Sequence, residues 1–176
     1  MSDRLRRIGF DGLIAGLIGY VAIAVFFMVL NGLQGRSPFY TAALLGAGVF
    51  TGLRDAATLS VEPGSVIAYN GLHIVVFLII GLVSARIALA VEENPRAFYP
   101  AFFAGVFGFI LVTAMVFAFA LYIGSTLSFW SIGGAMLFSV TGMLTYLLGM
   151  NPLLRAEIKH LDKLDEADAW TAVVSW

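Results

Sequence analysis

The sequence has no cysteine, which excludes disulfide bonds, thiolate metal sites and cysteine nucleophiles and leaves the redox environment undetermined. Charge is also scarce, because only 12% of the 176 residues are charged, against about a quarter in a soluble domain. The formal net charge is -1. No basic face is therefore available to neutralise phosphates, and we expect no nucleic-acid partner.

Short catalytic and metal-binding motifs are absent as well. The sequence contains no P-loop, no GxSxG, no HExxH and no Cys/His cluster. Its two histidines are His73, in an apolar run, and His160, in a charged C-terminal segment. Two-histidine haem ligation within the chain is thus excluded, and a metal at His73 would need a partner subunit. We predict no enzyme activity and no cofactor, and an intramembrane enzyme ranks third among the functions considered.

What the sequence has in abundance is apolar residues, which make up 60% of it. They are concentrated in four long runs, at about 8–33, 66–91, 98–123 and 129–150. A helix needs about 20 apolar residues to cross a bilayer, so each run is long enough. The predicted fold class is an all-α integral membrane protein, with a four-helix transmembrane domain over residues 1–150 and the lipid bilayer as its first partner.

The first run begins after a basic N-terminus, as the apolar core of a signal peptide does. That core is shorter, however, and a small-residue cleavage site follows it. Residues 31–35 make a poor cleavage site. We therefore expect residues 8–33 to remain as the first span.

Two segments do not fit the four-span pattern. Residues 39–53 are apolar and rich in glycine but too short to span the bilayer, which is typical of a re-entrant or interfacial segment. They form either a pore-lining loop or a short helix packed flat on the bundle. Residues 151–176 open with Asn151 and Pro152, a good N-cap and first helical residue, and predict a cytoplasmic amphipathic helix followed by a tail.

Small residues recur at helical spacing in two of the runs. In lipid such stripes permit close helix approach and mark contact faces. The predicted helix-packing residues are Gly12, Gly16, Gly19, Ser131, Ala135 and Ser139. The sequence at residues 15–19 is echoed at residues 104–108, either through duplication of a two-span unit or by chance.

Polar and ionisable side chains inside a membrane are costly, so they are candidate functional residues. Asn70 and His73 lie three residues apart on one helical face, which we expect to look into the bundle. His73 is either a neutral imidazole bonded to Asn70 or a backbone carbonyl, or a group that titrates in a transport or regulatory step. Asp11 and Arg86 either pair near the inner boundary or reach the headgroups separately.

The distribution of basic residues predicts the threading. With four spans, an N-terminus in the cytoplasm leaves only Arg36 and Arg54 outside, whereas the reverse threading places most of the positive charge outside. We therefore expect both termini to be cytoplasmic and the protein to lie in the plasma (inner) membrane.

These observations give two leading functional hypotheses. The first is a small non-enzymatic membrane subunit, accessory or structural, that packs with itself or with another membrane protein, because its small-residue stripes exceed the needs of a minimal bundle. The alternative is a small oligomeric transporter or channel, with Asn70 and His73 near its path.

Overall fold

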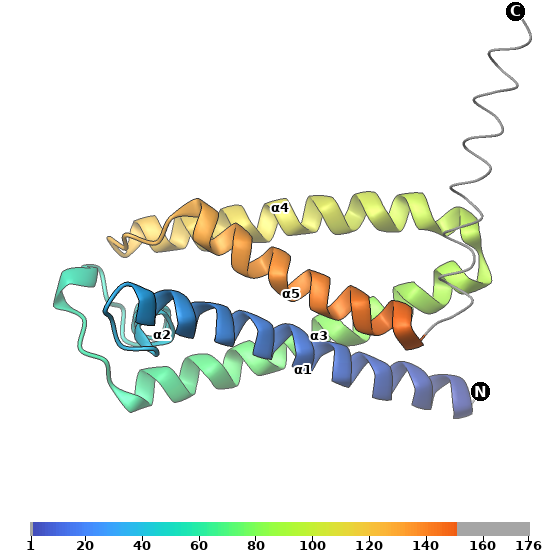
Figure 1. The fold of residues 1–176 in the computed structure, drawn as a ribbon, viewed down its shortest axis with the longest axis horizontal. Helices are drawn as coiled ribbons and strands as arrows, with labels where there is room; N and C mark the ends of the chain where they lie inside the picture. The colour runs from blue at the N-terminus through green and yellow to red at the C-terminus, as the bar shows by residue number, and fades with distance from the viewer. Residues whose placement is uncertain (1, 151–176) are drawn as a thin grey trace, which may run out of the picture.

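The computed structural model describes residues 2–150, which form an all-helical bundle (Figure 1). In chain order its elements are α1 (Ser2–Leu33), α2 (Tyr40–Phe50), the 3-10 turn η1 (Ala56–Thr58), α3 (Pro63–Glu93), the 3-10 turn η2 (Pro95–Ala97), α4 (Phe98–Tyr122) and α5 (Phe129–Met150). Four segments are long and apolar enough to cross a bilayer: Ile8–Leu33 within α1, and the whole of α3, α4 and α5. The predicted all-α fold class with four membrane-length helices is confirmed. The helix expected at 151–176 lies outside the described residues, as does His160.

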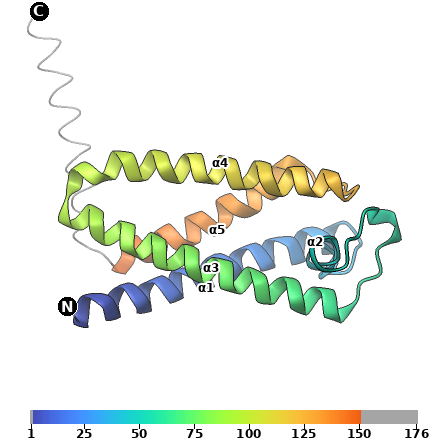
Figure 2. The same cartoon turned by 180° about the vertical axis from the view of Figure 1, so that it is seen from behind.

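The four long helices alternate in direction along the bundle (Figures 1 and 2). The start of α1, the α3–α4 turn and the end of α5 lie at one end of the molecule. The α1–α2 connection, η1 and the α4–α5 turn lie at the other end. Helix α5 runs diagonally between α1 and α4 (Figure 1), and α2 is seen nearly end-on in Figure 2, so its axis lies across the long helices.

Local signals in the sequence set the ends of the long helices. Pro63 opens α3, at a position where its missing N–H is not needed. Beyond the end of α3, the side chain of Asn94 accepts a hydrogen bond from the backbone N–H of Arg96 at 3.2 Å. Ser128 starts α5, because its hydroxyl accepts the backbone N–H of Ser131 at 3.1 Å in the manner of an N-cap.

Helices α1 and α3 cross at backbone contact through three glycines. A Cβ added at Gly81 would collide with the carbonyl oxygen of Gly12 and would lie 2.5 Å from the nitrogen of Gly16. A Cβ added at Gly16 would lie 2.5 Å from the carbonyl oxygen of Phe77. Only residues without a side chain permit this approach, so the crossing point sets how α1 and α3 diverge towards α2.

The short helix α2 lies inside one end of the bundle. Six of its 11 residues are buried, and its two leucines belong to an apolar cluster that draws on the α4–α5 region. The buried members of that cluster are Leu44, Leu45, Ala120, Ile123, Leu127 and Ile132. The helix covers less than the expected segment 39–53, because Gly52 turns the chain with a φ of 71°.

Helix α4 is the least covered of the long helices. Only 6% of the residues in its apolar 18-residue stretch are buried inside the bundle, against 17–28% in the corresponding stretches of the other three long helices. Gly105 and Gly108 have no atom within 4 Å of an added Cβ, whereas Gly16 and Gly19 meet neighbouring helices. The sequence echo between residues 15–19 and 104–108 therefore does not extend to their packing.

Candidate functional site

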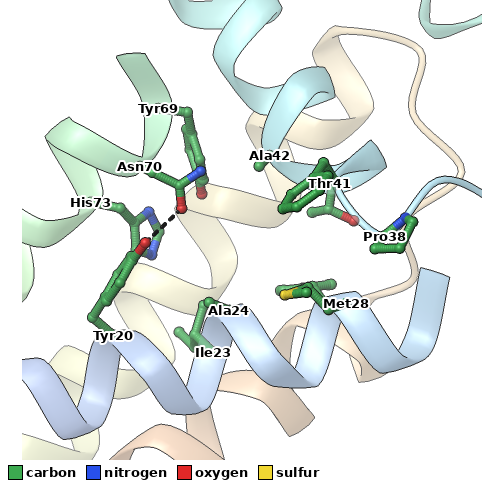
Figure 3. Close-up of a pocket in the computed structure, with 12 residues that line it drawn as sticks. Tyr20, Ile23, Ala24, Met28, Pro38, Thr41, Ala42, Tyr69, Asn70 and His73 are labelled. Carbon is green, nitrogen blue, oxygen red and sulfur yellow. Dashed lines mark hydrogen bonds between the residues drawn. The ribbon is translucent and has the colours of Figure 1, made fainter. Parts of the chain in front are cut away.

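A cavity of about 270 Å³ lies where α1, α2 and α3 meet (Figure 3). For scale, a cavity of about 150 Å³ holds benzene. The lining is mostly apolar, with most of its polar side chains on the wall formed by α3 and Tyr20 and one, Thr41, on the α2 side. The lining residues are Tyr20, Ile23, Ala24, Phe27, Met28, Pro38, Phe39, Thr41, Ala42, Tyr69, Asn70 and His73. The size suits a molecule with a single ring.

The polar wall is built on a hydrogen bond between α1 and α3. The hydroxyl of Tyr20 donates to Oδ1 of Asn70 at 2.9 Å (Figure 3). Nδ2 of Asn70 donates to the carbonyl oxygen of Val66, one turn earlier, at 2.8 Å. An amide group has two N–H donors, so one N–H of Asn70 is left over after these bonds.

His73 stands in a row of aromatic rings on α3. Its imidazole stacks on Phe77 with ring centroids 5.2 Å apart, and the ring of Tyr69 lies 4.8 Å away on the other side. The ring of Tyr20 approaches from α1 at 6.5 Å. Within residues 2–150, neither the His73 ring nor the Tyr69 hydroxyl has a hydrogen-bond partner. Neither of the hydrogen bonds considered for His73, to Asn70 or to a backbone carbonyl, is therefore formed in this part of the chain; Asn70 bonds Tyr20 and Val66 instead.

A second polar pair closes the cavity on the side of α2. The hydroxyl of Thr41 donates to Oδ1 of Asn31 at 3.0 Å, and Nδ2 of Asn31 donates to the carbonyl oxygen of Pro38 at 3.1 Å. Asn31 is 1% exposed. The pair holds the start of α2 and the loop before it against the end of α1, which gives the cavity its third wall.

The four predicted intramembrane polar residues do not form one site. Asn70 and His73 both line the cavity. Asp11 lies elsewhere in α1, where its carboxylate accepts a hydrogen bond from the hydroxyl of Tyr146 at 3.4 Å. Arg86 is exposed and forms no ion pair with Asp11 in the described part of the chain. The same part of the chain holds no group of three His, Asp or Glu side chains that could bind a metal.

The predicted packing residues mostly face neighbouring helices of the same chain. Gly12 and Gly16 meet α3, and Gly19 meets Met143 of α5. The hydroxyl of Ser139 donates to the carbonyl oxygen of Gly19 at 2.9 Å. On the same helix, Ala135 is fully buried, while Ser131 bonds the hydroxyl of Ser128 at the helix start.

Four polar residues of the site were not predicted from the sequence: Tyr20, Asn31, Thr41 and Tyr69. Each is a polar or amphipathic side chain within an apolar segment. Asn31, near the end of the first run, carries the clearest signal, since an amide at that depth needs partners. The partners themselves lie on segments distant in sequence, so the spacing of residues along one helix did not reveal them.

Comparisons with protein-family models, with curated proteins and with solved structures gave no significant match to this chain. The class of protein rests on the fold alone. It is an all-α protein with four helices of membrane-spanning length and a polar-walled cavity between three of its helices.

Proposed function

We propose that this is a non-enzymatic membrane protein that binds a small uncharged molecule in the cavity between α1, α2 and α3. One observation carries the proposal: the Tyr69 hydroxyl and the His73 imidazole border the cavity without a hydrogen-bond partner among residues 2–150. An unsatisfied polar group is costly in an apolar setting, so a ligand that bonds to both groups gains affinity. The lining contains no Lys, Arg, Asp or Glu, which favours an uncharged ligand.

The depth of the cavity supports a ligand taken up within the bilayer. His73 lies about 8 Å along the axis from the midpoint of α3, at ~1.5 Å per residue. The hydrocarbon core extends about 15 Å on each side of its centre. With α3 centred in the bilayer, the cavity then lies in one leaflet.

We propose that this leaflet is the outer one of the plasma membrane, with both termini in the cytoplasm. The distribution of basic residues supports this threading, because of the arginines in residues 2–150 only Arg36 and Arg54 belong to the end that contains α2, and the more basic end faces the cytoplasm. The guanidinium of Arg36 lies 4.7 Å from the ring centroid of Tyr40, and that of Arg54 lies 4.9 Å from the ring centroid of Tyr122. Tyrosine and arginine at one end of the spans suit a headgroup boundary.

The binding proposal is tested by filling the cavity. Ala24 points into it from α1 (Figure 3), so Ala24→Leu should occupy part of the space with a side chain. Ala118, exposed on α4, gives the matched control Ala118→Leu. In a thermal-stability screen with small neutral compounds, we expect some compounds to stabilise the wild type and Ala118→Leu but not Ala24→Leu. Equal stabilisation of all three proteins would contradict the proposal.

A second candidate function is a subunit that associates through α4. The exposed aromatic side chains of α4 and the open Gly105 and Gly108 favour it. The small-residue stripes of α1 and α5 support this hypothesis less, because most of their residues pack against other helices of the same chain. The hypothesis therefore rests on α4 rather than on α1 or α5.

Because the chain has no cysteine, a single introduced cysteine reports association directly. Gly105→Cys on α4 and Gly71→Cys on α3 are matched, since neither glycine has an atom within 4 Å of its added Cβ. If α4 is an interface, oxidative or bifunctional cross-linking in membranes should capture Gly105→Cys with a second chain or another protein, and Gly71→Cys much less. Equal capture at both positions would count against an α4 interface.

A further inference from the structure

Three hydrogen-bond donors around the cavity are not used by other groups of the described chain. Tyr69 offers an O–H, the neutral imidazole of His73 one N–H, and Asn70 its remaining N–H. Two other donors are already engaged, because Tyr20 donates to Asn70 and Thr41 donates to Asn31. The Tyr69 oxygen and the second His73 ring nitrogen can also accept, but a ligand with acceptor groups can use all three free donors. No cation lines the cavity to balance an anionic ligand. Carbonyl oxygens meet both conditions.

The shape of the polar wall favours a flat ligand. Tyr69, His73 and Phe77 follow one another at four-residue intervals on α3, with neighbouring ring centroids 4.8 and 5.2 Å apart. Tyr20 adds a fourth ring from α1. Aromatic faces pack well against another flat ring. About 270 Å³ accommodates one substituted ring but not a folded chain or a large fused ring system.

The cavity reaches the surface of the bundle at Met28 and Phe39. Both side chains line it, yet they are 41% and 49% exposed. Met28 projects from α1 next to Pro38 of the following loop (Figure 3). On the α1 side of this mouth Val25 and Val29 are also exposed, so an alkyl tail leaving the cavity along α1 meets apolar side chains.

We propose, on the basis of the binding function above, that the ligand is a lipid-soluble ring compound with carbonyl acceptors, of the quinone class. Its ring lies in the cavity, its carbonyl oxygens accept hydrogen bonds from Tyr69 and His73, and its alkyl tail leaves between Met28 and Phe39. The proposal concerns binding and includes no redox step.

The test measures binding of 2-decyl-1,4-benzoquinone to the full chain in lipid nanodiscs, by separating the nanodiscs from free probe and quantifying the retained quinone. Empty nanodiscs give the background of lipid partition. Decylbenzene, which carries the same decyl tail on a flat six-membered ring but has no carbonyl, is the control probe. We expect saturable quinone binding of about one molecule per chain, and weaker binding of decylbenzene.

Variants of Tyr69 and His73 test whether these side chains bind the quinone. Tyr69→Phe and His73→Phe keep the aromatic rings but remove the donors, and each should weaken quinone binding roughly three- to tenfold, as expected for one net hydrogen bond. Tyr122→Phe makes the same change outside the cavity and should leave binding unchanged. Thermal unfolding checks each variant, and if His73→Phe does not fold, Tyr69→Phe decides.

The outcomes separate the ligand class from the binding function. Equal binding of decylbenzene and the quinone, or equal quinone binding by Tyr69→Phe and the wild type, would overturn the quinone proposal. If Ala24→Leu still reduces the binding of either probe in those cases, the cavity remains a binding site for a different ligand. Saturable binding that Ala24→Leu leaves unchanged would overturn both proposals, because the probe then binds outside the cavity.

Discussion

Tyr20 in α1 donates a hydrogen bond to the side-chain oxygen of Asn70 in α3 at 2.9 Å, although 50 residues separate them in the chain. The bond lies at the wall of the cavity, about one helical turn along α1 from Gly16, where the same two helices cross. It holds Asn70 in the orientation that leaves one amide N–H unused. The arrangement of the candidate site thus depends on how α1 and α3 pair.

The strength of this bond can be measured with a double-mutant cycle. Tyr20→Phe and Asn70→Ala should each destabilise the protein, with a coupling of about 0.6 kcal/mol, the average for hydrogen bonds between membrane helices, and at most about 1.7 kcal/mol. The measurement is the free energy of unfolding in mixed micelles for the wild type, both single variants and the double variant. Coupling within error of zero would show that the two side chains do not interact in the folded protein.

The glycine crossing predicts a position-specific cost of adding a side chain. Gly81→Leu should destabilise the protein by roughly 1–3 kcal/mol or more, because its side chain meets the backbone of α1. Gly71→Leu, on the same helix but with open space around it, should have a much smaller effect. Thermal unfolding of both variants in detergent tests this, and equal losses of stability would argue against a close α1–α3 crossing.

The attachment of α2 to α1 depends on a buried hydroxyl. Thr41→Val removes the donor to Asn31 while nearly keeping the volume, and should cost about 1–2 kcal/mol because Asn31 stays buried and loses a partner. Thr141→Val is the control, since the hydroxyl of the exposed Thr141 donates to the carbonyl oxygen of Leu137 in its own helix and connects no two helices. Similar unfolding free energies for the two variants would mean that the Asn31–Thr41 pair contributes little.

The threading makes opposite predictions for two exposed positions at opposite ends of the bundle. A cysteine at Ser60 should react with an impermeant thiol reagent added outside intact cells, and a cysteine at Asn94 should react only after permeabilisation. The single cysteines are unambiguous because the chain has no other. The reverse labelling pattern would reject the proposed orientation.

Much of the fold was predictable because each long helix is encoded locally. Apolar runs of spanning length, interrupted by Pro63 and Pro95 and by polar turns, set the four helices without reference to the rest of the chain. The α3 face that carries Asn70 and His73 was likewise recognisable from its spacing. Periodicity predicts which side chains of a helix share one face.

The cavity was not predictable in the same way. It depends on three segments meeting, and on the close approach of α1 and α3 at Gly12, Gly16 and Gly81. Tyr20 bonds Asn70 across that crossing, although 50 residues separate the two in the chain. Periodicity within one helix does not determine which groups on another helix it faces.

The most direct test of the account is native mass spectrometry of the protein released from membranes in mild detergent, comparing the wild type with Ala24→Leu and Ala118→Leu. If the cavity binds a ligand in the membrane, a bound small molecule of defined mass is expected in the wild type and in Ala118→Leu, with its loss or marked reduction in Ala24→Leu. The same bound molecules in the same amounts in all three proteins, or no bound molecule in the wild type, would contradict the binding proposal.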